Sequence, residues 1–323
     1  MYPSKLEVIG IKSEINQNIT VVPGATDFFL AEDVQVKVVQ QFIPREFKHL
    51  SLDKLAHILG SVYVDVTFKM QLMASGVKAT AYAPLSTALQ ASKMSETIVP
   101  VTSITYAPIS AQVSTNFFTI GKSATIEVYE GATLTQTGVK KIIKGCVASG
   151  GPKITLEVDK YPMIEFSFRG LYTAWTDAVA PAVTYLAVNP PKVENLNLSA
   201  QGFAAIFTKL EIDLGCVATM RKNANSVDGV KGFATLDWNP KGSFDPEGEL
   251  MATENFIAKM RSGVEGQISA VLGTVAGQIT TITMPKTQYE VPDPAERDGM
   301  RTYQLPFKIN QNAGDDCITI VQT

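Results

Sequence analysis

The amino-acid sequence predicts a mainly β protein, built of sandwich or barrel-like layers in two tandem domains. Many short windows alternate apolar and polar residues and are rich in β-branched side chains, which is typical of half-buried strands. Turn residues separate these windows at regular intervals, and the chain holds 23 glycines and 17 prolines. The length of 323 residues exceeds the usual size of one domain.

The predicted strands share an alternation of period two, which places one set of side chains on each face of a sheet. In chain order they are 33–39, 61–72, 123–131, 153–158, 163–171, 210–215, 278–284, 301–309 and 317–323. One more strand is predicted over residues 242–252, directly before a helical segment.

Two segments have helical spacing. Residues 85–94 place apolar side chains near one face after Pro84. Residues 253–263 carry capping signals, since Thr253 can cap the first turn and Gly263 can end the helix. Both helices are short, so each needs a sheet to pack against.

A proline-rich stretch at 176–196 is the best domain boundary, because the paired Pro190 and Pro191 resist both helix and central strand. The order strand, helix, strands occurs on both sides of it, but identities are too few to decide whether the halves are duplicates. The predicted division is a first domain at 1–180, a linker at 181–192 and a second domain at 193–323.

Charge is scarce in this chain. Charged residues make up 18% of the sequence, against about 25% in typical soluble domains. Such a deficit is expected where neighbouring subunits cover the surface, and it also suits a monomer with a large core. The net charge of −3 argues against a basic nucleic-acid clamp.

The three cysteines, Cys146, Cys216 and Cys317, are far apart and odd in number, so we predict buried free thiols in a reducing compartment. The first ten residues lack the basic start and apolar core of a signal peptide. No run of 18 apolar residues predicts a membrane span. We therefore expect synthesis and assembly in a cytoplasm.

No motif supplies a complete set of catalytic or ligand residues. The Gly-Lys-Ser of 121–123 matches only the end of a phosphate-binding loop, because Asn116 stands where the motif needs glycine. A hairpin turn is the better interpretation. His49 and His57 have no zinc-ligand spacing and favour a loop or solvent-facing role. The sequence therefore predicts no enzyme activity, no catalytic, cofactor-binding or metal-binding residue, and no cofactor.

Three acidic segments are predicted to be turns. Residues 293–299 miss the spacing of a calcium loop and favour an exposed turn. Residues 243–249 have the same character, with a turn that starts at Asp245 and Pro246. Residues 314–316 are predicted to close the hairpin before the terminal strand.

Nearly end to end, the chain resembles the tail tube (major tail) proteins of long-tailed, non-contractile bacteriophages, of the two-domain type. The resemblance is weak over 74–125 and rests on ordered segments: 5–36, 44–72, 163–181, 190–205, 219–263 and 277–323. It implies that each domain is a β-sandwich or barrel with a flanking helix. It also implies that sheets continue from subunit to subunit into rings, and that rings stack into a tube.

The resemblance further implies a structural virion protein, assembled in the bacterial host cytoplasm. Its partners would be other copies of itself, as a hexamer or a pseudo-hexameric trimer, with tape-measure, terminator and baseplate proteins. Double-stranded DNA would pass through the lumen without specific binding, and no membrane is involved. A lining of acidic and uncharged residues avoids binding phosphate. We expect it on strands near 123–130, 153–159, 266–272 and 277–284, with Glu127 exposed to the lumen.

Two other functions stay open. One is another phage structural protein, such as a baseplate hub, a tail terminator or a capsid decoration protein. The other is a β-sandwich that binds a receptor or carbohydrate. Such modules usually display aromatic platforms, whereas Trp175 and Trp238 lie in no aromatic cluster of the sequence. A hydrolase on a β scaffold lacks a recognisable nucleophile, base or metal set.

Overall fold

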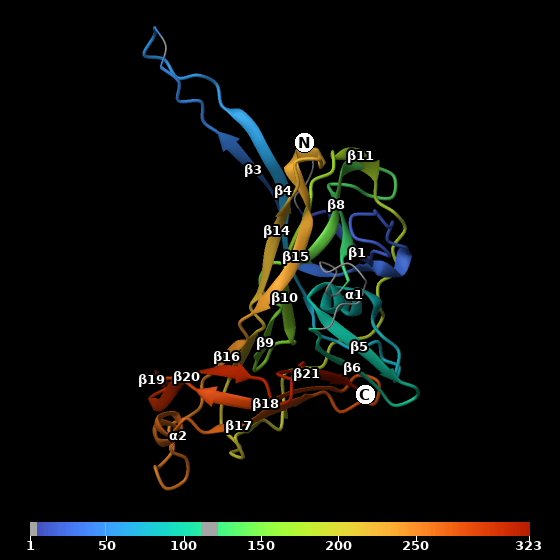
Figure 1. The fold of residues 1–323 in the computed structure, drawn as a ribbon. Helices are drawn as coiled ribbons and strands as arrows, with labels where there is room; N and C mark the ends of the chain where they lie inside the picture. The colour runs from blue at the N-terminus through green and yellow to red at the C-terminus, as the bar shows by residue number, and fades with distance from the viewer. Residues whose placement is uncertain (1–4, 49, 111–121) are drawn as a thin grey trace.

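The computed structural model describes residues 5–48, 50–110 and 122–323. The fold is mainly β, as the sequence predicts, and the strand pairs of the described residues are antiparallel. An upright body holds most of the first half of the chain, and a layer across its base holds much of the second half (Figure 1).

The strands of the first half are β1 (Glu7–Ser13), β2 (Phe28–Phe29), β3 (Ala31–Ile43), β4 (Ile58–Gln71), β5 (Met94–Val99), β6 (Ser103–Pro108), β7 (Ala124–Glu130), β8 (Thr137–Ala148), β9 (Lys153–Glu157), β10 (Met163–Leu171) and β11 (Thr176–Val179). Those of the second half are β12 (Ser199–Ala200), β13 (Lys209–Asp213), β14 (Cys216–Lys222), β15 (Val230–Trp238), β16 (Lys241–Phe244), β17 (Glu265–Leu272), β18 (Thr280–Tyr289), β19 (Asp293–Arg297), β20 (Met300–Asn310) and β21 (Thr319–Gln322).

Alternation predicts the core strands well. β4 buries every second residue from Val62 to Met70, and β10 buries every second residue opposite it. Between these strands the Phe68 ring lies 5.7 Å from that of Phe166 and 5.8 Å from that of Phe168. Strands with one buried face show this period because successive side chains point to opposite faces.

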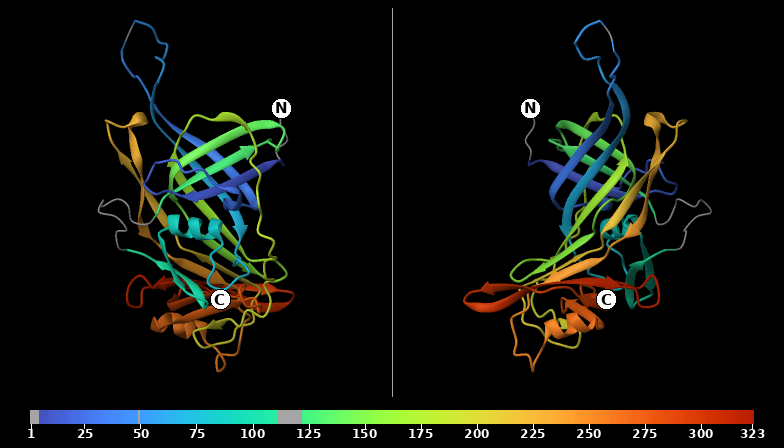
Figure 2. Two further views of the ribbon diagram at one scale, coloured as in Figure 1. Left: turned by 90° about the vertical axis from the view of Figure 1, so that its right-hand side faces the viewer. Right: turned by 60° about the vertical axis from the view of Figure 1, so that its left-hand side comes forward.

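The first helix, α1 (Ala83–Ala91), confirms the helix expected over 85–94. It carries proline in its first turn, where no backbone N–H is needed. Leu85, Ala88 and Leu89 are fully buried, and the helix contacts β1, β5, β7 and β8. It lies across the side of the upright body (Figures 1 and 2).

The second helix, α2 (Phe256–Ser262), lies in the expected segment but begins later. Thr253 is not its cap; the Asn255 Oδ1 atom accepts a hydrogen bond from the Ala258 N–H at 2.8 Å. The helix ends at Gly263, whose φ of 66° lies in the left-handed region. Phe256 packs edge-on against Tyr289 on β18, with 5.9 Å between the ring centroids.

Strands of the two predicted domains are hydrogen-bonded to each other. β9 pairs with β13, and β6 pairs with β21. One hydrophobic cluster includes buried side chains from both halves. Residues 181–192 contain neither helix nor strand and are exposed or half-buried; the division into two domains around them stays a prediction. An internal duplication stays a prediction.

Two acidic segments differ from their predicted form. Residues 293–297 form β19, which pairs with β20 across a turn at Asp298 and Gly299. Pro294 is tolerated there because β19 is an edge strand and needs no donor on its free side. The strand expected over 242–252 ends at Phe244, since the Asp245-Pro246 pair breaks it.

Candidate assembly interface

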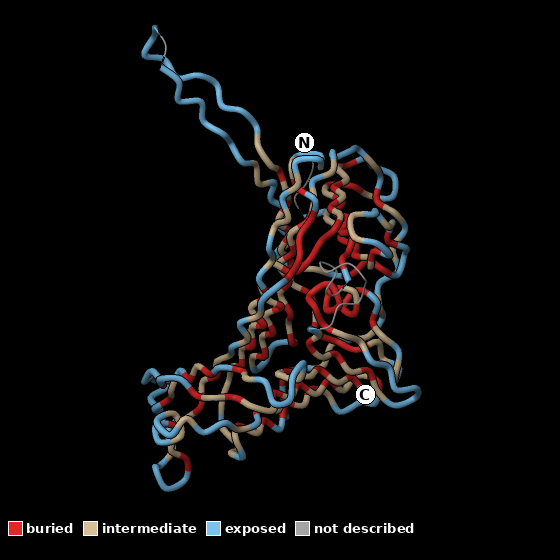
Figure 3. The backbone as a smooth tube through the Cα atoms, in the orientation of Figure 1, coloured by how far each residue is buried: buried red, intermediate tan, exposed pale blue. Residues whose placement is uncertain are grey.

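The most exposed feature of the molecule is a two-stranded arm formed by the end of β3 and the start of β4. Every described residue from 41 to 59 is exposed. Figure 3 shows the distal arm exposed along its whole length, away from the buried core. Ile43 is paired directly with Ile58, so the two strands leave the body as a hairpin, with an irregularity in the register between Gln40 and Phe42.

The arm carries large apolar side chains that contact no core. Their exposed fractions range from 36% for Leu55 to 110% for Leu50. The set is Phe42, Ile43, Phe47, Leu50, Leu52, Leu55, Ile58 and Leu59. Burial of apolar surface in an interface stabilises the complex by about 25 cal/mol per Å² of surface removed from water. Soluble monomers rarely leave a contiguous apolar patch of this kind uncovered, so the arm has the character of an interface.

The charges on the arm are mixed. Its basic and acidic side chains are Arg45, Lys48 and Lys54, and Glu46 and Asp53. His57 is solvent-exposed on the arm, as expected, with its ring 4.5 Å from that of Phe42. His49 lies outside the described residues. The arm is therefore not a basic clamp for nucleic acid.

The body also offers free sheet edges. Among the described residues, β3 pairs only with β4, and β5 pairs only with β6. An unpaired edge presents a row of backbone donors and acceptors to another chain. β3 is 13 residues long, which is long for an edge strand. Glu32, Asp33 and Lys37 place charge along it, which limits unspecific pairing.

Glu127 does not lie on an exposed surface, so its expected place in a lumen lining is wrong. Its side chain is 1% exposed, and it accepts a hydrogen bond from the Tyr129 hydroxyl at 2.8 Å. Its other carboxylate oxygen lies 3.0 Å from the Lys140 Nζ atom. All residues from Ala124 to Tyr129 are buried, because β7 lies between β1 and β8 with both faces covered.

The Gly-Lys-Ser segment does not form a phosphate loop. Gly121 lies outside the described residues, and Lys122 and Ser123 lead into strand β7 rather than a helix. The Ser123 hydroxyl donates to the buried Glu14 carboxylate at 2.6 Å. Within the described ranges, no three or more His, Cys, Asp or Glu side chains form a metal-binding group.

The remaining acidic segments stabilise local structure. The Asp245 carboxylate accepts from the backbone N–H groups of Thr208 and Lys209, and lies 2.8 Å from the Arg297 guanidinium. The Asp316 carboxylate accepts three backbone N–H groups of the turn before β21, and these bonds lower its pKa. Residues 314–316 lie in that turn, but the predicted hairpin is wrong, because β20 and β21 each pair with β18 and not with each other.

The three cysteines are free, as predicted, and Cys146 and Cys216 are buried. Burial raises the pKa of Cys146 well above its usual value, that of Cys216 to about 12 and that of Cys317 to about 11. Because the thiolate is the reactive form, we expect negligible modification of the folded protein by Ellman's reagent at pH 8. Modification should become complete in guanidinium chloride. Rapid reaction of Cys146 or Cys216 in the folded protein would contradict this packing.

Trp175 belongs to an aromatic pair on the surface of the body. Trp175 lies 6.3 Å from the Tyr172 ring, and the Lys141 Nζ atom lies 4.4 Å from the Trp175 centroid. Among the described ring contacts, Trp175 has this one aromatic neighbour, which is a pair and not a cluster. Both rings are slightly over one third exposed, and the lysine occupies the indole face that a sugar would need.

No protein-family model matches this chain, and no curated protein matches it. In the described parts of the chain, no helix is both long and apolar enough to cross a membrane.

Proposed function

We propose that this chain is a tail tube protein of a long-tailed, non-contractile bacteriophage, and that it polymerises into stacked rings around a DNA conduit. The single observation that carries the proposal is the arm, whose apolar side chains are exposed from residue 42 to residue 59. Exposed apolar surface of this kind marks an interaction site, so we expect another subunit to cover the arm in the working assembly.

The free edges supply the second kind of contact that a tube needs. Lateral pairing of one sheet with the next removes unpaired backbone groups and closes a ring. The arm projects away from the body (Figure 2), and we expect it to contact a subunit of another ring. Lateral and axial contacts together generate a hollow polymer.

The working mechanism is physical rather than catalytic. DNA sliding through a tube binds poorly to a wall that lacks clustered Lys and Arg, because few counterions are released. The low charge content and the net charge of −3 agree with such a wall. Tape-measure, terminator and baseplate proteins would set the length and close the ends of the polymer.

Negative-stain electron microscopy of the concentrated protein tests the proposal. We expect long hollow tubes built from stacked rings. Each ring should contain either three chains, with a pseudo-sixfold appearance in projection, or six chains. Isolated rings that never stack would instead favour a hub or a terminator. A protein that stays monomeric at all concentrations, with the arm intact, would contradict the proposal.

A further inference from the structure

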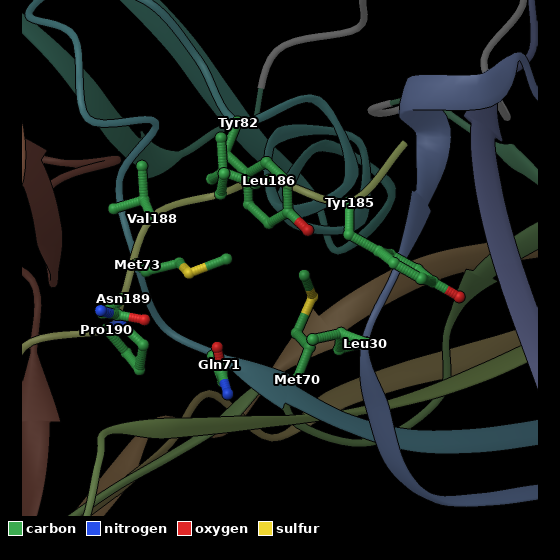
Figure 4. Close-up of a pocket in the computed structure, with 11 residues that line it drawn as sticks. Leu30, Met70, Gln71, Met73, Tyr82, Tyr185, Leu186, Val188, Asn189 and Pro190 are labelled. Atoms are coloured by element: carbon green, nitrogen blue, oxygen red, sulfur yellow. The ribbon is translucent and has the colours of Figure 1, made fainter. Parts of the chain in front are cut away.

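A small apolar pocket lies at the end of β4 that is farthest from the arm. It has a volume of about 270 Å³. Met70 and Gln71 are the last residues of β4, Met73 and Tyr82 follow them, and the chain at 185–190 forms the other wall. In Figure 4 the thioether side chains of Met70 and Met73 extend into one space, near the Tyr82 ring.

The floor of the pocket is buried and its mouth is open. Met70, Met73 and Tyr82 are at most 8% exposed, whereas Leu30 is 59% and Tyr185 is 37% exposed at the rim. Burial raises the pKa of Tyr82 to about 12, so this hydroxyl stays neutral across the physiological range. No ionisable carboxylate or amine lines the described walls. Gln71 and Asn189 add two uncharged amide side chains to the lining, so the pocket suits an uncharged and largely apolar group.

Its size and chemistry fit an aromatic side chain. A cavity of about 150 Å³ holds a benzene molecule, so this pocket has room for a phenyl ring and part of a second apolar group. Methionine sulfur makes favourable contacts with aromatic rings, and thioether side chains adapt their shape to a guest.

The chain itself supplies such a ring. Phe47 on the arm is 70% exposed, and within the described residues it has no ring partner. Phe42, the other aromatic side chain of the arm, already contacts His57. Phe47 is therefore the aromatic group that is free to enter a pocket.

Phe47 cannot reach the pocket of its own chain. It precedes the first residue of β4, while Met70 lies near the last, and this strand is 14 residues long. At about 3.3 Å per residue, the strand alone holds the two sites roughly 43 Å apart. Only the arm of a second copy can bring a phenylalanine to this pocket.

We propose that the pocket of Met70, Met73 and Tyr82 receives Phe47 from the arm of a second copy, an inference that rests on the proposed function. The two contact surfaces are different, and they lie at opposite ends of one strand. A contact of this heterologous kind leaves a free arm and a free pocket on every pair, so it propagates along the strand direction instead of stopping at a dimer.

Chemical cross-linking tests the contact. L30C at the pocket rim and E46C, beside Phe47 on the arm, are combined in a C317S background so that the aromatic ring is kept, and the concentrated protein is treated with a short bismaleimide. We expect covalent ladders of two, three, four and more subunits, because each copy links to the next. The matched control pairs L30C with V227C, since Val227 is 86% exposed on the turn between β14 and β15, which contacts β4 but does not line the pocket. It should give no ladder.

The outcomes separate the two proposals. Tubes of the parent protein together with no ladder above the control would overturn the pocket contact and leave the tail tube proposal standing. A covalent dimer without higher species would also overturn it, because a self-complementary contact ends there. If the parent protein forms no polymer at all, both the pocket contact and the tail tube proposal are contradicted.

A second measurement does not depend on the cysteine variants. F47A should raise the protein concentration needed for polymerisation at least ~10-fold, as truncation of a central aromatic anchor does. F47L should have a smaller effect, and V227A should have none. Equal critical concentrations for F47A and V227A would contradict the assignment.

Discussion

Replacing residues 44–57 by Asn-Gly should abolish polymerisation and leave the body folded. Ile43 and Ile58 are directly paired, so a two-residue turn can join them without changing the register. The variant loses four exposed apolar side chains, Phe47, Leu50, Leu52 and Leu55. These contribute nothing to the core and are expected to supply most of the axial contact.

Sedimentation and electron microscopy measure the loss of polymer, and circular dichroism measures the melting temperature, which should shift by no more than about 4 °C. A full-length control, in which the same four side chains become serine, separates the loss of apolar surface from the loss of arm length. Normal tubes from both variants would show that the arm takes no part in assembly.

Substituting Glu14 by alanine should destabilise the body more than any surface change. The Glu14 carboxylate is buried and accepts hydrogen bonds from the Asn18 and Gly145 N–H groups and from the hydroxyls of Ser123 and Thr125. The substitution leaves these donors without a partner inside the protein. We expect a loss of about 3–5 kcal/mol in the free energy of unfolding, measured by urea denaturation.

The same substitution should loosen the hairpin of β14 and β15. Beside Glu14, the Asn18 Nδ2 group donates to the Lys231 carbonyl at 2.8 Å, which ties this hairpin to the N-terminal segment. Amide hydrogen exchange near Lys231 should therefore accelerate. E46A on the exposed arm is the control and should change the free energy by less than about 0.5 kcal/mol. Equal urea midpoints for E14A and E46A would refute this account of Glu14.

The strand pattern could be predicted because it depends on local sequence. β4 and β10 alternate apolar and polar residues over most of their length, and a sheet with one buried face requires that alternation. The helix at 83–91 was equally accessible, since proline before an apolar stripe signals a first turn. For the helices, only the bounds of both and the capping residue of α2 differ from the prediction.

The arm was harder to predict, although a signal exists in the sequence. Apolar residues continue from Phe42 to Leu59 beyond the strand windows, with Pro44 as the only strong turn residue. Alternation shows that such residues share a face, but it does not show whether that face meets a core. The same limit explains the wrong prediction for Glu127. Alternation places this carboxylate on the exposed face of β7, but both faces of the strand are buried.

By itself, the sequence determined the mainly β class, the positions of the principal strands and helices, and the free state of the thiols. These properties follow from residue spacing and from the side chains of short segments. The tertiary structure alone decided which faces are buried, that strands of both halves share sheets, and that an apolar arm and an apolar pocket occupy opposite ends of β4. These depend on contacts between residues far apart in the chain, which local spacing does not encode.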